Sequence, residues 1–307
     1  MDTYSSEISA SAEGALRETE ADGVISRHFS HFRDLRLADA RLWPDSPHAC
    51  LPPSAQLAAL MEGAARLFPR LLPAGAEELA FTAAECPAGV TREGRTRCRV
   101  VHDQPDRPQC RAELFLRDLM PNGRARQSYS LTCAARILPA MDPASAPILP
   151  DQARAPASAS AAAAGRWALR DFYERRTGFG PGFRLLTELN LLEEKRLLAR
   201  TRVPAGTEPA GSDNAGLHYP ADAFEAAAQA MLVLALKRNV WQNIGSRMAL
   251  LRVSAAYFLR LCIPGETLEL ELRDNADDPH TFHCDADVRD ARGGMVLALR
   301  GMRPGVE

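Results

Sequence analysis

The stretch AGLHYPADAFEAAAQAMLVLAL, residues 215–236, predicts a buried helix that nevertheless contains a carboxylate. Most of its residues are Ala, Leu, Met and Phe, so the helix is apolar nearly all round and must be covered on most sides. Glu225 and Gln229 are four residues apart and therefore share one face. Burying a charge is costly unless the group is paired, so Glu225 is either a carboxylate that reaches solvent at the helix end or a group with a functional role.

The region around this helix has a counterpart earlier in the chain. Strand-like sequence, a loop, one apolar helix and then three or four alternating strands occur in residues 27–140 and again in 166–307. The first helix is SAQLAALMEGAARLF (54–68), and ELAFTAAEC (78–86) is the first strand-like run after it. The alternation is typical of antiparallel sheets with one solvated face. A helix wrapped by such a curved sheet is a hotdog unit, so we expect an α+β double hotdog.

Composition gives the boundaries of these units. Pro, Ala and Ser dominate residues 141–165, which predicts a linker between an N-terminal hotdog at 27–140 and a C-terminal hotdog at 166–307. Residues 1–26 are mostly acidic and polar, which predicts a poorly ordered leader and argues against a signal peptide.

Charge and cysteine usage exclude several classes. The net charge of −2 gives no electrostatic case for nucleic acid binding. The seven cysteines are odd in number and contain no CxxC pair, which favours free thiols in a reducing cytosol. Because no apolar run reaches the roughly 18 residues of a membrane span, we expect a cytoplasmic protein.

Three segments carry a resemblance to the dehydratase domains of polyketide and fatty acid synthases. FYERRTGFGPGFRLL (172–186) resembles the signature of their C-terminal hotdog, a Tyr followed by Gly, an aromatic residue, Gly-Pro, any residue and Phe-Arg. The matching residues are Tyr173, Gly178, Gly180, Pro181, Phe183 and Arg184, with Phe179 where the family usually has Tyr. GLHYPADAFEAAAQA resembles its His-Pro stretch and Asp-x-x-x-Gln helix, and VRDARGGMVLALRGMRP its closing strands. The resemblance covers residues 172–303 and, more faintly, 28–138.

The resemblance implies a reaction and its acid. Such domains dehydrate a β-hydroxyacyl thioester held on an acyl carrier protein, and the reaction needs a base for the α-proton and an acid for the departing hydroxyl. The family takes its acid from the helix of the second hotdog, where Glu225 stands four residues before Gln229. An apolar tunnel would raise the pKa of that carboxyl and let it donate a proton. Asp222 is the competing acid. The predicted substrate-binding residues are Gln229, His218, Tyr219, Phe179, Gly180 and Pro181.

The first hotdog departs from the family pattern at the base. In LADARLWPDSPHACLPP, Ala40 stands where the family has its catalytic His, and Pro44 where a Gly is expected. His48 is the one imidazole in this loop and is therefore the candidate base. Loss of a general base typically costs ~10²–10⁴-fold in rate.

No metal or redox cofactor is implied. His280, His283 and Cys284 lie in a strand pattern that does not place all three on one face. The phosphopantetheine arm would arrive with the carrier protein, and the expected partners are that carrier, other synthase components and a second copy of the chain in a homodimer. Three functions stay open: a dehydratase weakened at the base, a catalytically silent carrier-binding or scaffolding double hotdog, and a hotdog thioesterase.

Overall fold

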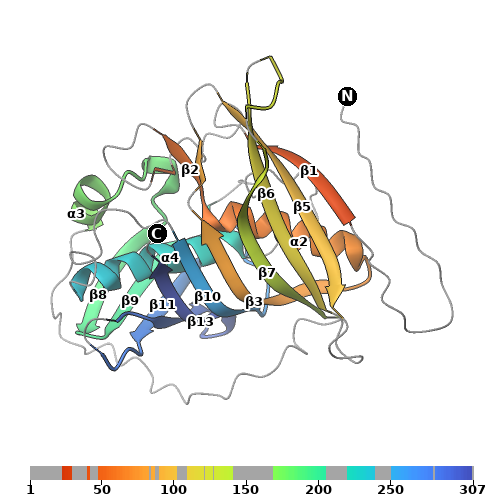
Figure 1. Ribbon diagram of the computed structural model, residues 1–307. Coiled ribbons are helices and arrows are strands. Elements are labelled where there is room, and N and C mark those ends of the chain that lie inside the picture. The colour runs from red at the N-terminus through yellow and green to blue at the C-terminus, as the bar shows by residue number, and fades with distance from the viewer. Residues whose placement is uncertain are drawn as a thin grey trace.

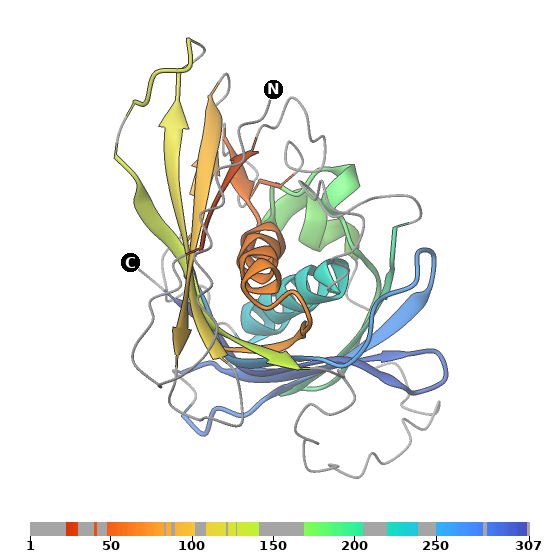
Figure 2. The same cartoon turned by 90° about the vertical axis from the view of Figure 1, so that its right-hand side faces the viewer.

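A computed structural model describes residues 23–29, 40–41, 48–82, 84–86, 90–101, 109–120, 122–126, 128–140, 169–204, 220–238, 250–278 and 281–305. Two long helices, α2 (Pro53–Leu67) and α4 (Ala221–Lys237), lie on the same side of one large antiparallel sheet (Figure 1). Seen along the helices, the sheet curves around both of them (Figure 2). Neither is long and apolar enough to cross a membrane, nor is any other helix in the described ranges.

The large sheet has eleven strands in the order β1-β5-β6-β7-β3-β10-β13-β12-β11-β9-β8. Its strands are β1 (Gly23–Phe29), β3 (Leu72–Thr82), β5 (Thr91–Val101), β6 (Gln109–Leu119), β7 (Ser130–Ala140), β8 (Leu186–Glu193), β9 (Arg196–Arg202), β10 (Leu250–Phe258), β11 (Thr267–Asp274), β12 (Cys284–Asp290) and β13 (Met295–Gly305). Short helical segments, α3 (Leu169–Asp171), η2 (Phe172–Arg176) and η3 (Pro181–Phe183), precede β8.

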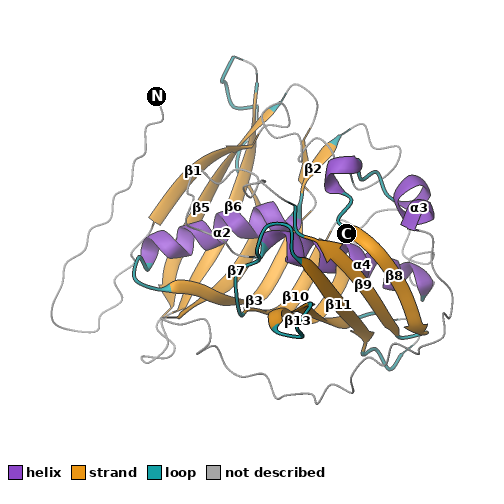
Figure 3. Ribbon diagram, turned by 180° about the vertical axis from the view of Figure 1, so that it is seen from behind, coloured by secondary structure: helices purple, strands orange, loops and turns teal. Residues whose placement is uncertain are grey.

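The strand order repeats about the centre of the sheet. The first long strand after each helix, β3 or β10, occupies the centre, and the two pair antiparallel with Phe81 opposite Leu251. Outward from this pair run β7, β6, β5 and β1 on one side, and β13, β12, β11, β9 and β8 on the other. Each half is therefore one helix against its own part of a shared sheet (Figure 3), and the predicted double hotdog is confirmed.

The core lies between the sheet and the helices. The rings of Phe81 in β3 and Phe224 in α4 lie 5.7 Å apart, so the central strand of the first unit packs on the helix of the second. Gly63 lets α2 approach β5 closely, because a Cβ at that position would lie 2.6 Å from Cys98 Sγ. Because α2 and β5 pack this closely, even one added methyl group at their contact would destabilise the fold.

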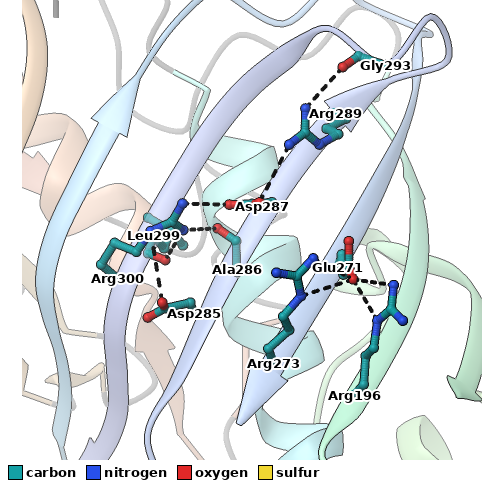
Figure 4. A network of polar contacts seen from close by, with 10 residues as sticks. All are labelled: Arg196, Glu271, Arg273, Asp285, Ala286, Asp287, Arg289, Gly293, Leu299 and Arg300. Atoms are coloured by element: carbon teal, nitrogen blue, oxygen red, sulfur yellow. Dashed lines mark hydrogen bonds and ion pairs between the residues drawn. The ribbon is translucent and has the colours of Figure 1, made fainter. Parts of the chain in front are cut away.

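The outer face of the C-terminal half is charged. Leu270 and Leu272 are buried beneath the sheet, whereas Glu271 between them accepts hydrogen bonds from Arg196 and Arg273. A second group of ion pairs joins arginines and aspartates of β12 and β13 (Figure 4). The net gain of such ion pairs is small because forming them removes water from the charged groups, so the apolar inner face supplies most of the stability.

The first strand that the structure describes starts before the predicted beginning of the N-terminal hotdog at residue 27. β1 begins at Gly23, inside the predicted leader 1–26, and all seven of its residues pair with β5. A backbone ladder to a neighbouring strand forms an edge strand here despite the polar composition before it. The predicted linker 141–165 lies outside the described residues, as do residues 1–22.

Candidate active site

A cavity of about 50 Å³ lies between the two hotdog units. The lining residues from the first unit are Ala40, Cys50, Leu51, Pro52, Pro53, Gln56, Phe81 and Thr82, and those from the second are Phe179, Phe183, Glu225, Ala228, Gln229, Met231, Leu232 and Leu251. Most of these side chains are apolar, so the few polar groups decide what the cavity binds.

Glu225 is the carboxylate of this cavity. Its side chain comes from the second turn of α4, is only 4% exposed, and accepts a hydrogen bond of 3.2 Å at Oε2 from the backbone N–H of Ser54. Ser54 lies in the first turn of α2, where Pro52 provides no side-chain cap and Pro53 has no N–H. The next two N–H groups both donate to the Pro52 carbonyl. The carboxyl group of one unit thus caps the helix of the other.

Gln229 holds the neighbouring segment in place. Its Oε1 accepts hydrogen bonds from the Tyr173 hydroxyl at 2.9 Å and the Leu185 N–H at 3.3 Å, and its Nε2 donates to the Phe183 carbonyl at 2.8 Å. The Tyr173 hydroxyl accepts in turn from the Leu186 N–H, and burial raises the pKa of this Tyr, so it stays protonated as a donor. We expected Gln229 to bond the carboxyl or a substrate. Its observed partners are instead residues of the segment 172–186, whose buried backbone groups need partners.

The segment held by Gln229 contributes aromatic walls. Phe179, a predicted binding residue, lines the cavity, and so does Phe183, which the sequence does not mark as a binding residue. The two rings pack edge to face, with their centroids 5.2 Å apart. Gly180 and Pro181 do not line it, because Pro181 begins the turn η3 and is exposed to solvent. The other two predicted binding residues, His218 and Tyr219, lie outside the described residues.

The first unit brings Ala40, and not an imidazole, to the cavity. Ala40 is 2% exposed, lines the cavity and accepts a backbone hydrogen bond from Cys50 at 2.6 Å. The position that corresponds to the family's His therefore does face the predicted site. His48 is half-buried directly before β2 (Ala49–Leu51) and is not among the lining residues. Pairing of β2 with β4 (Ala84–Cys86) fixes the strand in which Cys50 and Leu51 line the cavity.

The remaining candidates lie elsewhere. Asp222 is partly exposed in the first turn of α4 and does not line the cavity, so it is not brought together with Gln229 as the competing acid. Its charge lies near Cys262, where burial, helped by Glu266 and Asp222, raises the pKa of the thiol to about 12. Within the described ranges, no group of three or more His, Cys, Asp or Glu is arranged to hold a metal ion.

Two hotdog units that share one sheet and enclose a carboxylate between their helices define a double-hotdog protein. Residues 150–304 match the family model described as polyketide synthase dehydratase N-terminal domain, which covers half of the chain. The chain therefore belongs to the polyketide synthase dehydratase family.

Solved structures agree with this assignment at the level of the fold. The N-terminal dehydratase from the difficidin assembly line is similar with a TM-score of 0.68 at 12% identity, covering 93% of this chain and 94% of that one. The dehydratase domain from the CurK module of curacin polyketide synthase has a TM-score of 0.67 at 12% identity, with 95% of each chain covered. That of RzxB from Pseudomonas fluorescens has a TM-score of 0.60 at 18% identity, covering 92% and 94%. No curated protein matches the sequence significantly.

Proposed function

We propose that this chain acts on β-hydroxyacyl thioesters presented by an acyl carrier protein, as a dehydratase with slow turnover in polyketide or unusual fatty acid synthesis. The observation that carries the proposal is the buried carboxylate of Glu225 in an otherwise apolar cavity between the units. A family fold, a cavity at the interface of the two units and one proton-carrying group within it support this reaction.

Glu225 is the proposed acid. Elimination of water from a β-hydroxyacyl thioester breaks the C–H bond at the α-carbon and the C–O bond at the β-carbon, and the leaving hydroxyl takes a proton. A carboxyl group in an apolar cavity can supply that proton without competition from bulk water. The hydrogen bond from Ser54 holds Oε2 of the carboxyl at the start of α2, beside the cavity.

The base is the weak part of this site. Ala40 occupies the cavity wall where the family carries a His, and no described lining residue has an imidazole. His48 lies two residues before Cys50, on the loop that leads into the cavity, and remains our proposed base. A site whose base must act from outside the described cavity would turn over roughly 10²–10⁴ times more slowly than a complete one.

Ala40 also favours a second function, that of a catalytically silent carrier-binding protein. With the base replaced by a methyl group, the cavity could still bind an acyl chain, and the chain would then serve as a silent carrier-binding member of a synthase. Several structurally similar proteins are named as parts of a synthase module or assembly line, so we propose synthase components and the carrier as partners. The phosphopantetheine arm of the carrier is the only prosthetic group that this proposal requires. A homodimer and a cytoplasmic location remain predictions.

The test uses a 3-hydroxyhexanoyl group on an acyl carrier protein and follows both the enoyl thioester and the free acid by mass spectrometry. Glu225→Gln should abolish the enoyl product, because the amide keeps an acceptor for Ser54 but cannot transfer a proton to the leaving hydroxyl. Glu62→Gln is the matched control, since Glu62 is a buried glutamate of α2 that pairs with Arg66 and does not line the cavity.

The outcomes separate the functions. Enoyl product that is lost in Glu225→Gln and in His48→Ala but kept in Glu62→Gln supports the dehydratase. Binding of the acyl carrier without any product identifies the silent protein. Free acid without enoyl product shows a thioesterase and refutes both proposals.

A further inference from the structure

Gln56 is a buried polar residue of the cavity that the sequence did not single out. It lies in the first turn of α2, is 1% exposed and lines the cavity together with Glu225. Its Nε2 donates two hydrogen bonds, to the Leu51 carbonyl at 3.0 Å and to the Thr82 carbonyl at 3.2 Å. Both amide hydrogens are thus used to hold the end of β2 to the end of β3.

These two carbonyls fix the orientation of the amide. A carbonyl oxygen only accepts hydrogen bonds, so the NH₂ group must face Leu51 and Thr82, and a flipped amide would place oxygen against oxygen. The remaining polar atom, Oε1, is buried and receives no hydrogen bond from any residue that the structure describes. Buried acceptors are almost always satisfied, so this oxygen lacks a partner that a ligand in the cavity can supply.

The missing partner must be a donor. A thioester group and an acyl chain have no N–H or O–H, whereas a hydroxyl group on the acyl chain has one donor and two acceptor sites. We propose that Gln56 Oε1 is the binding site for the hydroxyl group of a hydroxyacyl ligand. The identity of the ligand rests on the function proposed above.

In this arrangement each helix interacts with the hydroxyl group in a different way. The hydroxyl donates its hydrogen to Gln56 from α2, while its lone pairs stay available to the carboxyl of Glu225 from α4. When the C–O bond breaks, the oxygen keeps its hydrogen, takes a second one from the carboxyl and leaves as water. Gln56 therefore orients the hydroxyl and does not itself exchange a proton.

The test compares the binding of two ligands to the full chain. The probes are the pantetheine thioesters of 3-hydroxyhexanoic and hexanoic acid, titrated calorimetrically, with product analysis after each titration to exclude turnover. A neutral hydrogen bond corresponds to a preference of about fivefold for the hydroxy ligand. Gln56→Met, which keeps the length of the side chain without the acceptor, should reduce the ratio of the two affinities to about one. The ratio cancels any general damage to the cavity.

Gln109 provides a matched control. Its side chain in β6 is also buried with an unsatisfied Oε1, but it does not line the cavity, so Gln109→Met should keep the preference. If Gln56→Met does not fold, Gln56→Asn withdraws the amide by one methylene and should also lose the preference. The 3-oxohexanoyl thioester, which has no donor at that carbon, should bind the unaltered protein no better than the hexanoyl ligand.

Two results would overturn the inference. Equal affinities of the unaltered protein for both ligands would show that Oε1 binds only a water molecule, and an unchanged preference in a folded Gln56 variant would place the hydroxyl elsewhere. Turnover decides a different question: a preference for the hydroxy ligand in a protein that forms no product supports this subsite and refutes the dehydratase.

Discussion

Replacing Ala40 by His should raise the rate of the dehydration that we propose for this protein. The side chain of Ala40 already lines the cavity that contains Glu225, at the position where the family resemblance places the catalytic His. A new imidazole would supply the base for the α-proton, and general base catalysis is worth ~10²–10⁴-fold in rate. Since each tenfold step is about 1.4 kcal/mol of barrier, the gain is roughly 3–5 kcal/mol.

The same substitution should also lower the free energy of unfolding, because the imidazole ring is larger than the methyl group it replaces. Ala40 is 2% exposed and the cavity volume is only about 50 Å³, so the ring must displace water and press on the wall. Overpacking of this kind typically costs about 1–3 kcal/mol of folding free energy, which a domain of ordinary stability tolerates. We therefore expect a folded variant with a lower unfolding midpoint and a higher rate.

The assay follows enoyl thioester from 3-hydroxyhexanoyl acyl carrier protein over a range of pH. The rate of Ala40→His should fall as the pH drops below about 6.5, where an ordinary imidazole takes up a proton and ceases to be a base. Ala40→Phe controls for bulk, and Ala49→His places the same ring on the neighbouring strand at a buried position outside the cavity lining. The reasoning fails if folded Ala40→His is no faster than Ala40→Phe.

Three further predictions concern the framework of the site and the sheet. Tyr173→Phe removes the hydroxyl that donates to Gln229 and should cost about 1–3 kcal/mol in the free energy of unfolding, measured with urea, because buried partners are left unsatisfied. Gly63→Ala should cost about 1–3 kcal/mol by pressing a methyl group on Cys98 Sγ, and a second change, Cys98→Ala, should recover part of that loss. Burial and a neighbouring glutamate raise the pKa of Tyr129 from 10.0 to about 12. Its contribution to stability should be complete below pH 10 and be lost as the pH rises through 12, and Tyr129→Phe should remove this part of the alkaline loss in urea titrations.

The sequence predicts the helices and strand-like runs of the chain, whereas it does not predict which distant strands pair. The apolar composition of residues 54–68 and 215–236 predicts both helices, and three of the four predicted ends lie within one residue of α2 and α4; α4 itself starts at Ala221, six residues after the predicted start. The pattern of ELAFTAAEC (78–86) predicts one strand-like run, but the structure divides it between β3 and β4, which pair with different partners. Glu78 has a positive φ of 53° at the irregular part of β3, a backbone state that sequence pattern does not reveal.

The site shows the same division. Glu225 could be found because a carboxylate stood out in an apolar helix, and Ala40 because a motif was broken there. The sequence does not predict the hydrogen-bond partners of Gln229, since Tyr173 and Leu185 come from 56 and 44 residues away and depend on how the segment before β8 folds over α4. Gln56 was missed, although it poses the same question as Glu225: a polar residue in a helix of Ala and Leu.

The two polar residues together explain how one cavity can serve both halves of the fold. Gln56 lies in the first turn of α2 and Glu225 in the second turn of α4, and the helices are equivalent elements of the repeated topology. Because the sheet is continuous through β3 and β10, the starts of both helices are held against one cavity, where α2 contributes Gln56 and α4 contributes Glu225. Neither unit alone contains the pair. A change that separates the units should therefore remove hydroxyl binding and Glu225 chemistry together, whereas Gln56→Met should remove only the first.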